Sequence, residues 1–173
     1  TQNDQDVLKD PDIEMVCIAS YDEAHHRQVM DALNHGKHVY VEKPICLTKK
    51  EALDIRQALK LNPHLRLSSN MVLRTCPLFI KARETVQSKE IGEIYHVEAD
   101  YFWGRKEKII SGWRAEAGLY SIIHGAAVHM VDLAMWIVGK KPNTVQVLGS
   151  NIATAGTMQK HNDFAILLLG FND

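Results

Sequence analysis

Two groups of residues have the types and spacing that chemistry requires, and the first is a charged pair after a strand-like run. Glu42 and Lys43 follow the apolar run His38–Val41, and Pro44 comes next. Proline disfavours helical backbone at the residue before it, so we expect Lys43 to be extended. An ammonium group at the end of a buried strand can polarise a carbonyl or hold a developing alkoxide. A plain surface Glu–Lys pair explains the residues alone equally well.

The second group lies in an apolar segment, residues 121–138, that predicts a helix. His129 and Asp132 are three residues apart and share one face of it. Histidine suits proton transfer at neutral pH. Considered alone, however, the pair is better explained as a hydrogen-bonded core pair, because polar groups among apolar ones need partners. His124 lies five residues before His129, which is poor spacing for joint metal binding, so no metal site is expected.

Other polar residues are weaker candidates. His25 opens a predicted helix, whose positive end attracts anions such as a cofactor phosphate, although a solvated turn is the simpler explanation. Asn70 and Arg74 follow a predicted strand and could bind nicotinamide or substrate, or only cap the sheet edge. Trp113 and Arg114 could stack on a ring and hold a phosphate, or only cover a core.

The first part of the sequence predicts elements that would bring several candidates to one edge. Apolar runs at 13–20, 38–41 and 65–73 predict strands, and helical patterns from Asp22 to Gly36 and from Thr48 to Leu59 separate them. This is the βαβαβ pattern of a parallel sheet, in which ligands bind at the carboxyl ends of the strands. The segments at that edge are 19–25, 42–44 and 69–74, so Ala19 and Ser20 join the cofactor-binding candidates.

The pattern changes after Pro77 and predicts a second, α+β domain with a mainly antiparallel sheet. We therefore expect a partial dinucleotide-binding domain over 1–75 and a partial substrate-binding and oligomerisation domain over 76–173. The predicted elements of the second are a helix at 78–89, a strand at 93–103, a polar loop at 105–114, the apolar helix at 121–138 and strands at 145–152 and 164–171.

Composition narrows the function classes. The chain has 173 residues, 46% of them hydrophobic and 24% charged, with a formal net charge of −1. The near-neutral charge argues against nucleic-acid binding. No apolar run is long enough to span a membrane, and no secretory signal is visible. Three widely spaced cysteines favour reduced thiols and a cytoplasmic location.

These pieces occur in an order that resembles the Gfo/Idh/MocA family of NAD(P)-dependent sugar and inositol dehydrogenases. The most specific motif is GKHVYVEKP at 36–44, followed by AVHMVDLAMWIVG at 127–139. Further matching stretches are DPDIEMVCIAS at 10–20, TKKEA at 48–52, Asn70-x-x-x-Arg74-x-x-Pro77, EIGEI at 90–94 and Gly112-Trp113-Arg114.

The resemblance implies a Rossmann domain followed by a domain with an open sheet whose outer face joins subunits in a homo-oligomer. It implies NAD or NADP as cofactor and a small sugar or polyol as substrate. Glu42, Lys43 and Pro44 would border the nicotinamide, and Lys43 would reach the substrate. His129 would exchange a proton with the substrate hydroxyl, and Asp132 would orient the site or the substrate.

Two departures from the family pattern matter. The Gly-x-Gly-x-x-Gly turn that binds the pyrophosphate is missing, since no glycine precedes Gly36. We therefore expect a fragment of an oxidoreductase that by itself binds NAD(P) weakly or not at all. The aspartate that many members carry four residues before the histidine is Gly125 here, so proton transfer would rest on His129, or on His124 if it turns inward. His124 is therefore a further substrate-binding candidate, beside Asp132, Asn70 and Arg74. A non-catalytic sugar- or nucleotide-sensing protein and a pure oligomerisation module remain the alternatives.

Overall fold

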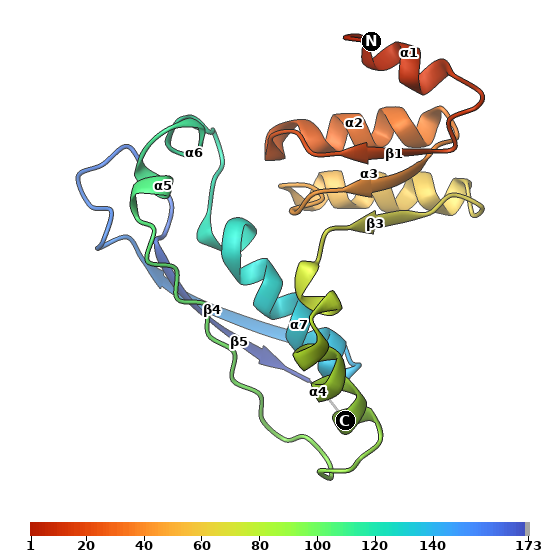
Figure 1. Cartoon of the computed structure of the whole chain (residues 1–173). Coiled ribbons are helices and arrows are strands. Elements are labelled where there is room, and N and C mark those ends of the chain that lie inside the picture. Colours follow the sequence, from red (N-terminus) through yellow and green to blue (C-terminus); the bar gives the residue numbers. More distant parts are fainter. Residues whose placement is uncertain (172–173) are drawn as a thin grey trace. The chain divides into compact units, whose positions relative to one another are not determined.

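The computed structural model describes residues 1–171, and its internal contacts divide this part of the chain into two compact units. The first runs from Thr1 to Asn70, and the second begins at Met71 (Figure 1). The first unit holds a parallel sheet and the second an antiparallel one. This arrangement confirms the predicted fold class, a Rossmann-like α/β part followed by an α+β part. No helix among the described residues is both long and apolar enough to cross a membrane.

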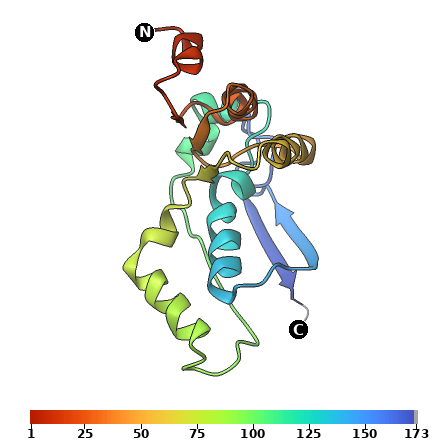
Figure 2. The ribbon, with the colours of Figure 1, turned by 90° about the vertical axis from the view of Figure 1, so that its right-hand side faces the viewer.

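Two helices cover one face of the three-stranded parallel sheet in the first unit. Figure 2 shows α2 and α3 side by side along this sheet. Each helix connects one strand to the next, which confirms the predicted β–α–β–α–β order. In sequence order the elements are β1 (Met15–Ile18), α2 (Asp22–Asn34), β2 (His38–Val41), α3 (Lys49–Leu61) and β3 (Leu67–Ser69), and the strand order in the sheet is β1-β2-β3.

The core of the first unit forms where α2 meets β2. Val29 and Leu33 of α2 and Val39 and Val41 of β2 are all buried, with at most 2% of each exposed. Tyr40 lies between the two buried valines in sequence and is exposed, because successive strand residues point to opposite faces. The helices therefore cover only the face to which the valines point.

Local signals set the ends of these helices. The Thr48 side chain accepts a hydrogen bond from the backbone of Glu51, and the Glu51 side chain accepts one from the backbone of Thr48, which is the predicted capping box of α3. Gly36, just after α2, has a φ of 72°, a left-handed conformation that glycine adopts without strain. A helix that the sequence patterns did not predict, α1 (Asp4–Lys9), begins after the capping residue Asn3.

The second unit packs helices near a two-stranded sheet, and α4 lies beside α7 (Figure 1, Figure 2). Strands β4 and β5 pair antiparallel, with Val147 opposite Leu167. The elements are the 3₁₀ turn η1 (Val72–Thr75), α4 (Pro77–Gln87), the short helices α5 (Glu107–Ile110) and α6 (Trp113–Glu116), the π-helical turn η2 (Ile123–Ala127), α7 (Val128–Val138), β4 (Thr144–Ser150) and β5 (Phe164–Gly170).

Two strand predictions were wrong in extent or in kind. The strand predicted at 65–73 is limited to Leu67–Ser69, because the chain turns at Asn70 into η1. The segment 93–103 is not a strand, although its residues alternate. A strand requires a partner for its backbone, and β4 and β5 pair with each other among the described residues. Tyr95 is fully exposed and Phe102 is 91% exposed, so these side chains gain no burial that would favour a strand.

Two other predictions need smaller corrections. The predicted polar loop at 105–114 contains α5 and the start of α6, in which Ile109 is buried. The apolar helix predicted at 121–138 is interrupted near its start, because η2 forms a π turn before α7 begins. Its predicted end is confirmed, since Gly139 caps α7 with a φ of 76°.

Candidate functional site

At the carboxyl edge of the parallel sheet, three polar side chains form a hydrogen-bonded row. The Asn70 amide donates to Oε1 of Glu42 over 2.6 Å, and its oxygen accepts from the Tyr40 hydroxyl over 2.8 Å. Glu42 follows β2 and Asn70 follows β3, so adjacent parallel strands deliver them to one place. The row fixes the orientation of the Asn70 amide and holds the Glu42 carboxylate in place.

A buried imidazole supports the same edge from behind. His25 lies in the first turn of α2 and is 1% exposed. Its Nδ1 lies 2.7 Å from the carbonyl oxygen of Pro44, and its Nε2 lies 3.2 Å from the carbonyl oxygen of Ser20. Because both ring nitrogens already face protein oxygens, His25 holds these two segments in position rather than presenting itself to a ligand.

Lys43 is half-buried between the row and this support. Its backbone N–H donates to the Glu42 carboxylate over 3.3 Å, and a cis peptide bond links it to the buried Pro44. The turn is thus held on both sides of Lys43, by Asn70 through Glu42 and by His25 through Pro44.

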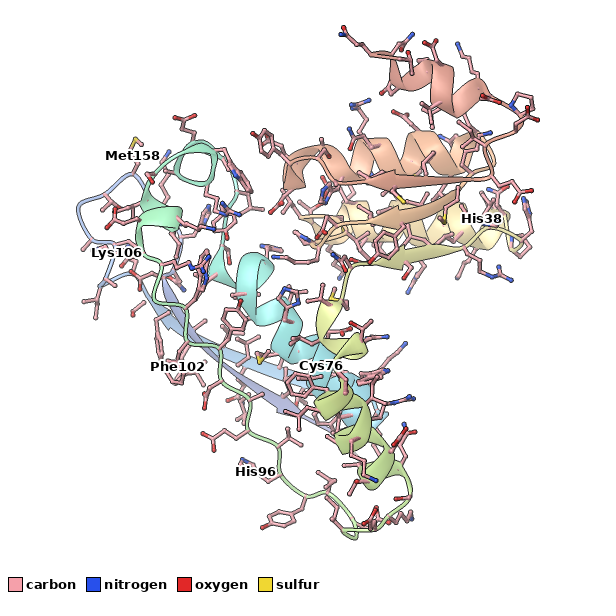
Figure 3. All side chains as sticks on the ribbon, viewed as in Figure 1. His38, Cys76, His96, Phe102, Lys106 and Met158 are labelled. Carbon is pink, nitrogen blue, oxygen red and sulfur yellow. The ribbon has the colours of Figure 1, made fainter. Side chains whose placement is uncertain are left out.

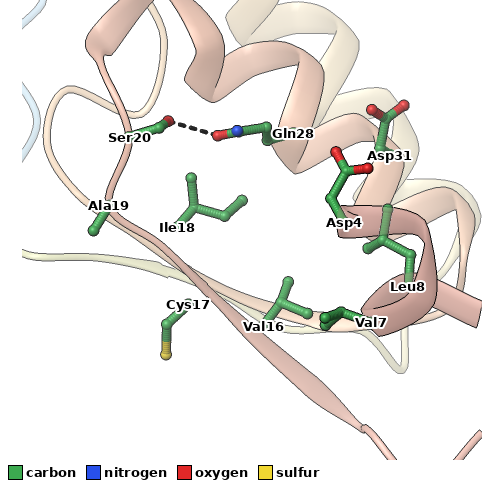
Figure 4. Close-up of a pocket in the computed structure, with 10 residues that line it drawn as sticks. All are labelled: Asp4, Val7, Leu8, Val16, Cys17, Ile18, Ala19, Ser20, Gln28 and Asp31. Atoms are coloured by element: carbon green, nitrogen blue, oxygen red, sulfur yellow. Dashed lines mark hydrogen bonds between the residues drawn. The ribbon is translucent and has the colours of Figure 1, made fainter. Parts of the chain in front are cut away.

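An open pocket of about 220 Å³ lies beside β1 (Figure 4). Apolar side chains of α1 and β1, among them Leu8, Val16 and Ile18, line most of it. Ala19 and Ser20 line the end that follows β1, where the Ser20 hydroxyl donates to Gln28 over 2.6 Å. The two predicted cofactor-binding residues therefore border a concave surface.

In the second unit, Arg74 and Asp132 bind each other through two hydrogen bonds. Nε of Arg74 lies 2.8 Å from Oδ2 of Asp132, and Nη2 lies 2.5 Å from Oδ1. The guanidinium carbon of Arg74 also lies 5.9 Å from the ring centre of Trp136, on the next turn of α7. Arg83 of α4 lies 4.8 Å from the same ring centre and donates to the Trp136 carbonyl oxygen. These contacts tie η1 and α4 to α7.

Aromatic rings surround the histidine segment of the second unit. The Tyr101 ring stacks on His129 with 6.4 Å between the ring centres. The Arg114 guanidinium lies 4.3 Å from the ring centre of Trp113, and Trp113 meets Tyr120 edge to face. Trp113 and Arg114 therefore stack on each other, and their predicted contact with a cofactor stays a prediction.

The structure thus groups the predicted site residues by unit. Glu42, Asn70 and His25 meet around the Lys43 turn, and Arg74 and Asp132 meet one turn after His129. Sequence reasoning missed Tyr40, which alternation placed on the face opposite the buried valines. It also missed Tyr120, which no motif marked. Among residues 1–171, no three His, Cys, Asp or Glu side chains form a group that could hold a metal ion.

The fold is a Rossmann-like α/β unit followed by an α+β unit, and comparison with known families agrees. Residues 1–68 match the oxidoreductase family with the NAD-binding Rossmann fold, and residues 79–173 match the GFO/IDH/MocA C-terminal domain. The chain belongs to the Gfo/Idh/MocA family of oxidoreductases.

Individual relatives are similar along most of the chain. An oxidoreductase from Formosa agariphila is 28% identical over 149 residues, which cover 83% of this chain and 46% of the relative. An inositol 2-dehydrogenase from Salmonella typhimurium is 23% identical over 142 residues, covering 82% and 40%. The chain therefore spans less than half the length of these relatives.

Solved structures share the fold over nearly the whole chain. An oxidoreductase domain protein from Kribbella flavida has a TM-score of 0.84 at 25% identity and covers 97% of this chain and 48% of that one. The scyllo-inositol dehydrogenase of Lactobacillus casei, solved with NAD(H) and scyllo-inositol, has a TM-score of 0.76 at 23% identity and covers 97% and 50%.

Proposed function

We propose that this chain is part of an NAD(P)-dependent oxidoreductase that transfers hydride between the cofactor and a hydroxyl or carbonyl carbon of a sugar or polyol. Family membership supports the reaction class. The single observation that carries the proposal is the hydrogen-bonded Lys43 turn at the carboxyl edge of the parallel sheet. In open α/β sheets that edge is where nucleotide cofactors bind.

The residues of this edge fit the nicotinamide end of the cofactor. Glu42, Lys43 and Pro44 would border it, with Ala19 and Ser20 at the neighbouring strand end, and His25 would keep both segments in position. When bound, the nicotinamide accepts or returns the hydride. The ammonium of Lys43 would stabilise negative charge on the substrate oxygen while the carbon–hydrogen bond breaks.

The second unit would supply proton transfer and substrate contacts. His129 would take the hydroxyl proton as the carbonyl forms and return it in the reverse direction. Asp132 and Arg74 bind each other, so we propose that this pair fixes the His129 turn of α7 and offers its remaining polar atoms to the substrate. We also propose that Arg114, whose guanidinium stacks on Trp113, binds a phosphate of the cofactor.

The cofactor's pyrophosphate requires a site that residues 1–171 do not supply in the usual form. Glycine-rich turns let backbone N–H groups approach the pyrophosphate, and no glycine precedes Gly36. We therefore propose that the 173-residue chain binds NAD(P)H weakly or not at all. Isothermal titration checks this, and micromolar binding would contradict it.

The test of the enzyme proposal is Lys43→Ala in the longest natural form of the protein that contains this chain. NAD(P) reduction across a sugar and polyol panel should fall by about 10²–10⁴-fold. Lys49→Ala, at the exposed start of α3, is the matched control and should leave the rate unchanged. If no panel member is turned over by the unaltered protein, the sensing alternative is favoured, because Gly125 stands where many members carry aspartate.

One observation favours an assembly role in addition. On one face of the β4–β5 sheet, Leu148, Ile166 and Leu168 are 73%, 55% and 64% exposed. The register places Leu148 opposite Ile166, so these side chains form a continuous apolar surface. We propose that it joins copies of the protein in a homo-oligomer. Leu148→Glu should lower the mass measured by light scattering, and a strict monomer before substitution would contradict the proposal.

A further inference from the structure

Tyr40 lies on the face of the parallel sheet opposite the one that α2 and α3 cover. Successive residues of β2 alternate between faces, so Tyr40 shares its face with His38, which Figure 3 labels. The register pairs Tyr40 with Ser68 of β3, but its hydroxyl donates to Oδ1 of Asn70, two residues further along, over 2.8 Å. Strand side chains lean along the strand direction, and only a long side chain with a polar end can span this offset. The hydroxyl therefore makes the contact that the ring alone would not make.

The chemistry of the three side chains fixes the direction of the hydrogen-bonded row. An ionised carboxylate only accepts hydrogen bonds, so the amide nitrogen of Asn70 must face Glu42 and its oxygen must face away. That oxygen then needs a donor on its other side, and the Tyr40 hydroxyl supplies it. Glu42 and Tyr40 together therefore hold the Asn70 amide at both of its ends, in one orientation.

The Glu42 carboxylate connects this amide to the Lys43 turn. Its Oε1 accepts from the Asn70 amide over 2.6 Å, and its Oε2 accepts from the backbone N–H of Lys43 over 3.3 Å. The backbone of Asn70 is fixed as well, because its N–H donates to the carbonyl oxygen of Val41 over 3.0 Å. A change in the orientation of the Asn70 side chain would therefore reach the Lys43 turn through a single carboxylate.

We infer that Tyr40 is a positioning residue for the proposed hydride transfer, since its hydroxyl orients Asn70 and, through Glu42, the Lys43 turn. This inference rests on the proposed function. Tyr40 itself does not need to touch the cofactor or the substrate. An amide nitrogen carries two hydrogens, and the contact with Glu42 uses one of them. The orientation that Tyr40 enforces therefore also determines where the second N–H of Asn70 points.

The first test reads the Asn70 amide in the 173-residue chain, without cofactor or turnover. Nuclear magnetic resonance detects its two side-chain hydrogens as the signals that Asn70→Asp removes. Tyr40→Phe keeps the ring and removes only the hydroxyl, so exchange of these hydrogens with water should become about two- to tenfold faster. Tyr95→Phe, at a fully exposed tyrosine, is the matched control and should leave the exchange unchanged. Unchanged exchange in Tyr40→Phe would overturn the inference.

The second test uses turnover in the longest natural form of the protein. For a polyol that the unaltered protein oxidises, Tyr40→Phe should lower kcat about two- to tenfold. The KM for NAD(P)⁺ should change less than about twofold, because parts of the cofactor remote from the reacting carbon supply most of its binding energy. The Tyr40–Asn70 hydrogen bond is exposed, so the urea midpoint should move by less than about 0.5 M. A loss of rate would then not reflect a loss of folded protein.

A double-mutant cycle separates positioning through Asn70 from any other role of Tyr40. In an Asn70→Ala background, Tyr40→Phe should cause no further loss of kcat, because the contact through which it acts is already absent. An equal loss in both backgrounds, or no loss in either, would overturn the inference while leaving the dehydrogenase proposal intact. Absence of any turnover by the unaltered protein would instead defeat the proposed function, and the amide exchange alone would then decide whether Tyr40 orients Asn70.

Discussion

The Nδ1 atom of His25 lies 2.7 Å from the carbonyl oxygen of Pro44, nineteen residues along the chain. The same imidazole reaches the Ser20 carbonyl with its other nitrogen, so one buried side chain joins the segments that follow β1 and β2. Both segments belong to the proposed cofactor edge. The edge therefore owes its shape to a residue that a ligand does not need to touch.

Replacing His25 by leucine should lower the free energy of unfolding by about 2–4 kcal/mol, because the buried Pro44 carbonyl oxygen and the partly buried Ser20 carbonyl oxygen lose their facing ring nitrogens. Urea unfolding followed by circular dichroism measures this. His64→Leu, an exposed position in the same unit, should change it by less than about 0.5 kcal/mol. Equal effects of the two substitutions would show that the contacts of His25 contribute nothing.

Lys37 is the second buried polar residue whose removal should be costly. Its ammonium donates to the carbonyl oxygens of Asp10 and Ile13 over 2.5 and 2.7 Å, and the residue is 6% exposed. Lys37→Met keeps the length of the side chain but leaves both carbonyls without this donor, so a loss of about 1–3 kcal/mol in unfolding free energy is expected. Lys60→Met, at an exposed position of α3, serves as control. A stability equal to that of the control would refute the anchoring role.

The Arg74–Asp132 pair should show a measurable coupling energy. Arg74 is 46% exposed at its side chain and Asp132 is 18% exposed, so solvent screens part of the attraction. A double-mutant cycle with Arg74→Ala and Asp132→Ala should give about 0.5–1 kcal/mol at low salt, and less in 1 M salt. A coupling of zero at low salt would mean that the two hydrogen bonds do not stabilise the second unit.

Gly125 should resist even the smallest enlargement. Gly→Ala inside a helix ordinarily stabilises by about 0.5–1 kcal/mol, but here the added methyl group would meet the Tyr120 ring. Gly125→Ala should therefore destabilise by about 1–3 kcal/mol. In a Tyr120→Ala background the same change should become neutral or favourable. Thermal unfolding of the four proteins decides the matter, and a stabilising Gly125→Ala in the unaltered background would exclude the clash.

The capping box of α3 should make stability depend on pH. Burial raises the pKa of Glu51. Hydrogen bonds from the backbone N–H groups of Leu47 and Thr48 lower it, and the lowering effects together outweigh burial, so the pKa lies below its ordinary value. A lowered folded-state pKa gives stability that is complete above the unfolded-state pKa and is lost as the pH falls through the folded-state value.

Glu51→Gln should therefore be less stable than the unaltered chain at pH 6, by about 0.5–1 kcal/mol, and this difference should shrink as the pH falls toward 3. Urea midpoints between pH 3 and pH 6 provide the measurement. Glu14→Gln, at an exposed position, should show no such convergence. A difference that stays constant with pH would contradict the assignment to the Glu51 carboxylate.

Sequence patterns predicted the structure correctly wherever a helix or strand is determined by residues close together in the sequence. The capping box, the glycine after α2 and the apolar runs of the strands depend on near neighbours in sequence, so the parallel sheet was predictable. Sequence patterns failed where the secondary structure of a segment depends on another segment that must pair or pack with it. Residues 93–103 alternate as a strand does, but pairing needs a partner that alternation cannot report.

In the candidate site, too, features set by neighbouring residues in the sequence were predictable, and features set by distant contacts were not. The Lys43 turn was predictable, because a strand followed by Glu-Lys-Pro fixes its place at the sheet edge. The π turn was not, because residues 121–138 carry one continuous apolar helical pattern that gives no sign of a wider turn at Ile123–Ala127. The stacking of Arg114 on Trp113 was likewise decided by neighbouring rings.

The segment 93–103 also has a consequence for handling the protein. Its aromatic residues Tyr95 and Phe102 lie in solvent on a backbone outside any helix or strand, so chymotrypsin should cut there first. The nick would divide the second unit covalently between α4 and α7. Because these helices pack against each other, the two pieces should elute together on a sizing column and separate only in denaturant. A preparation that looks intact by chromatography can therefore already be cleaved.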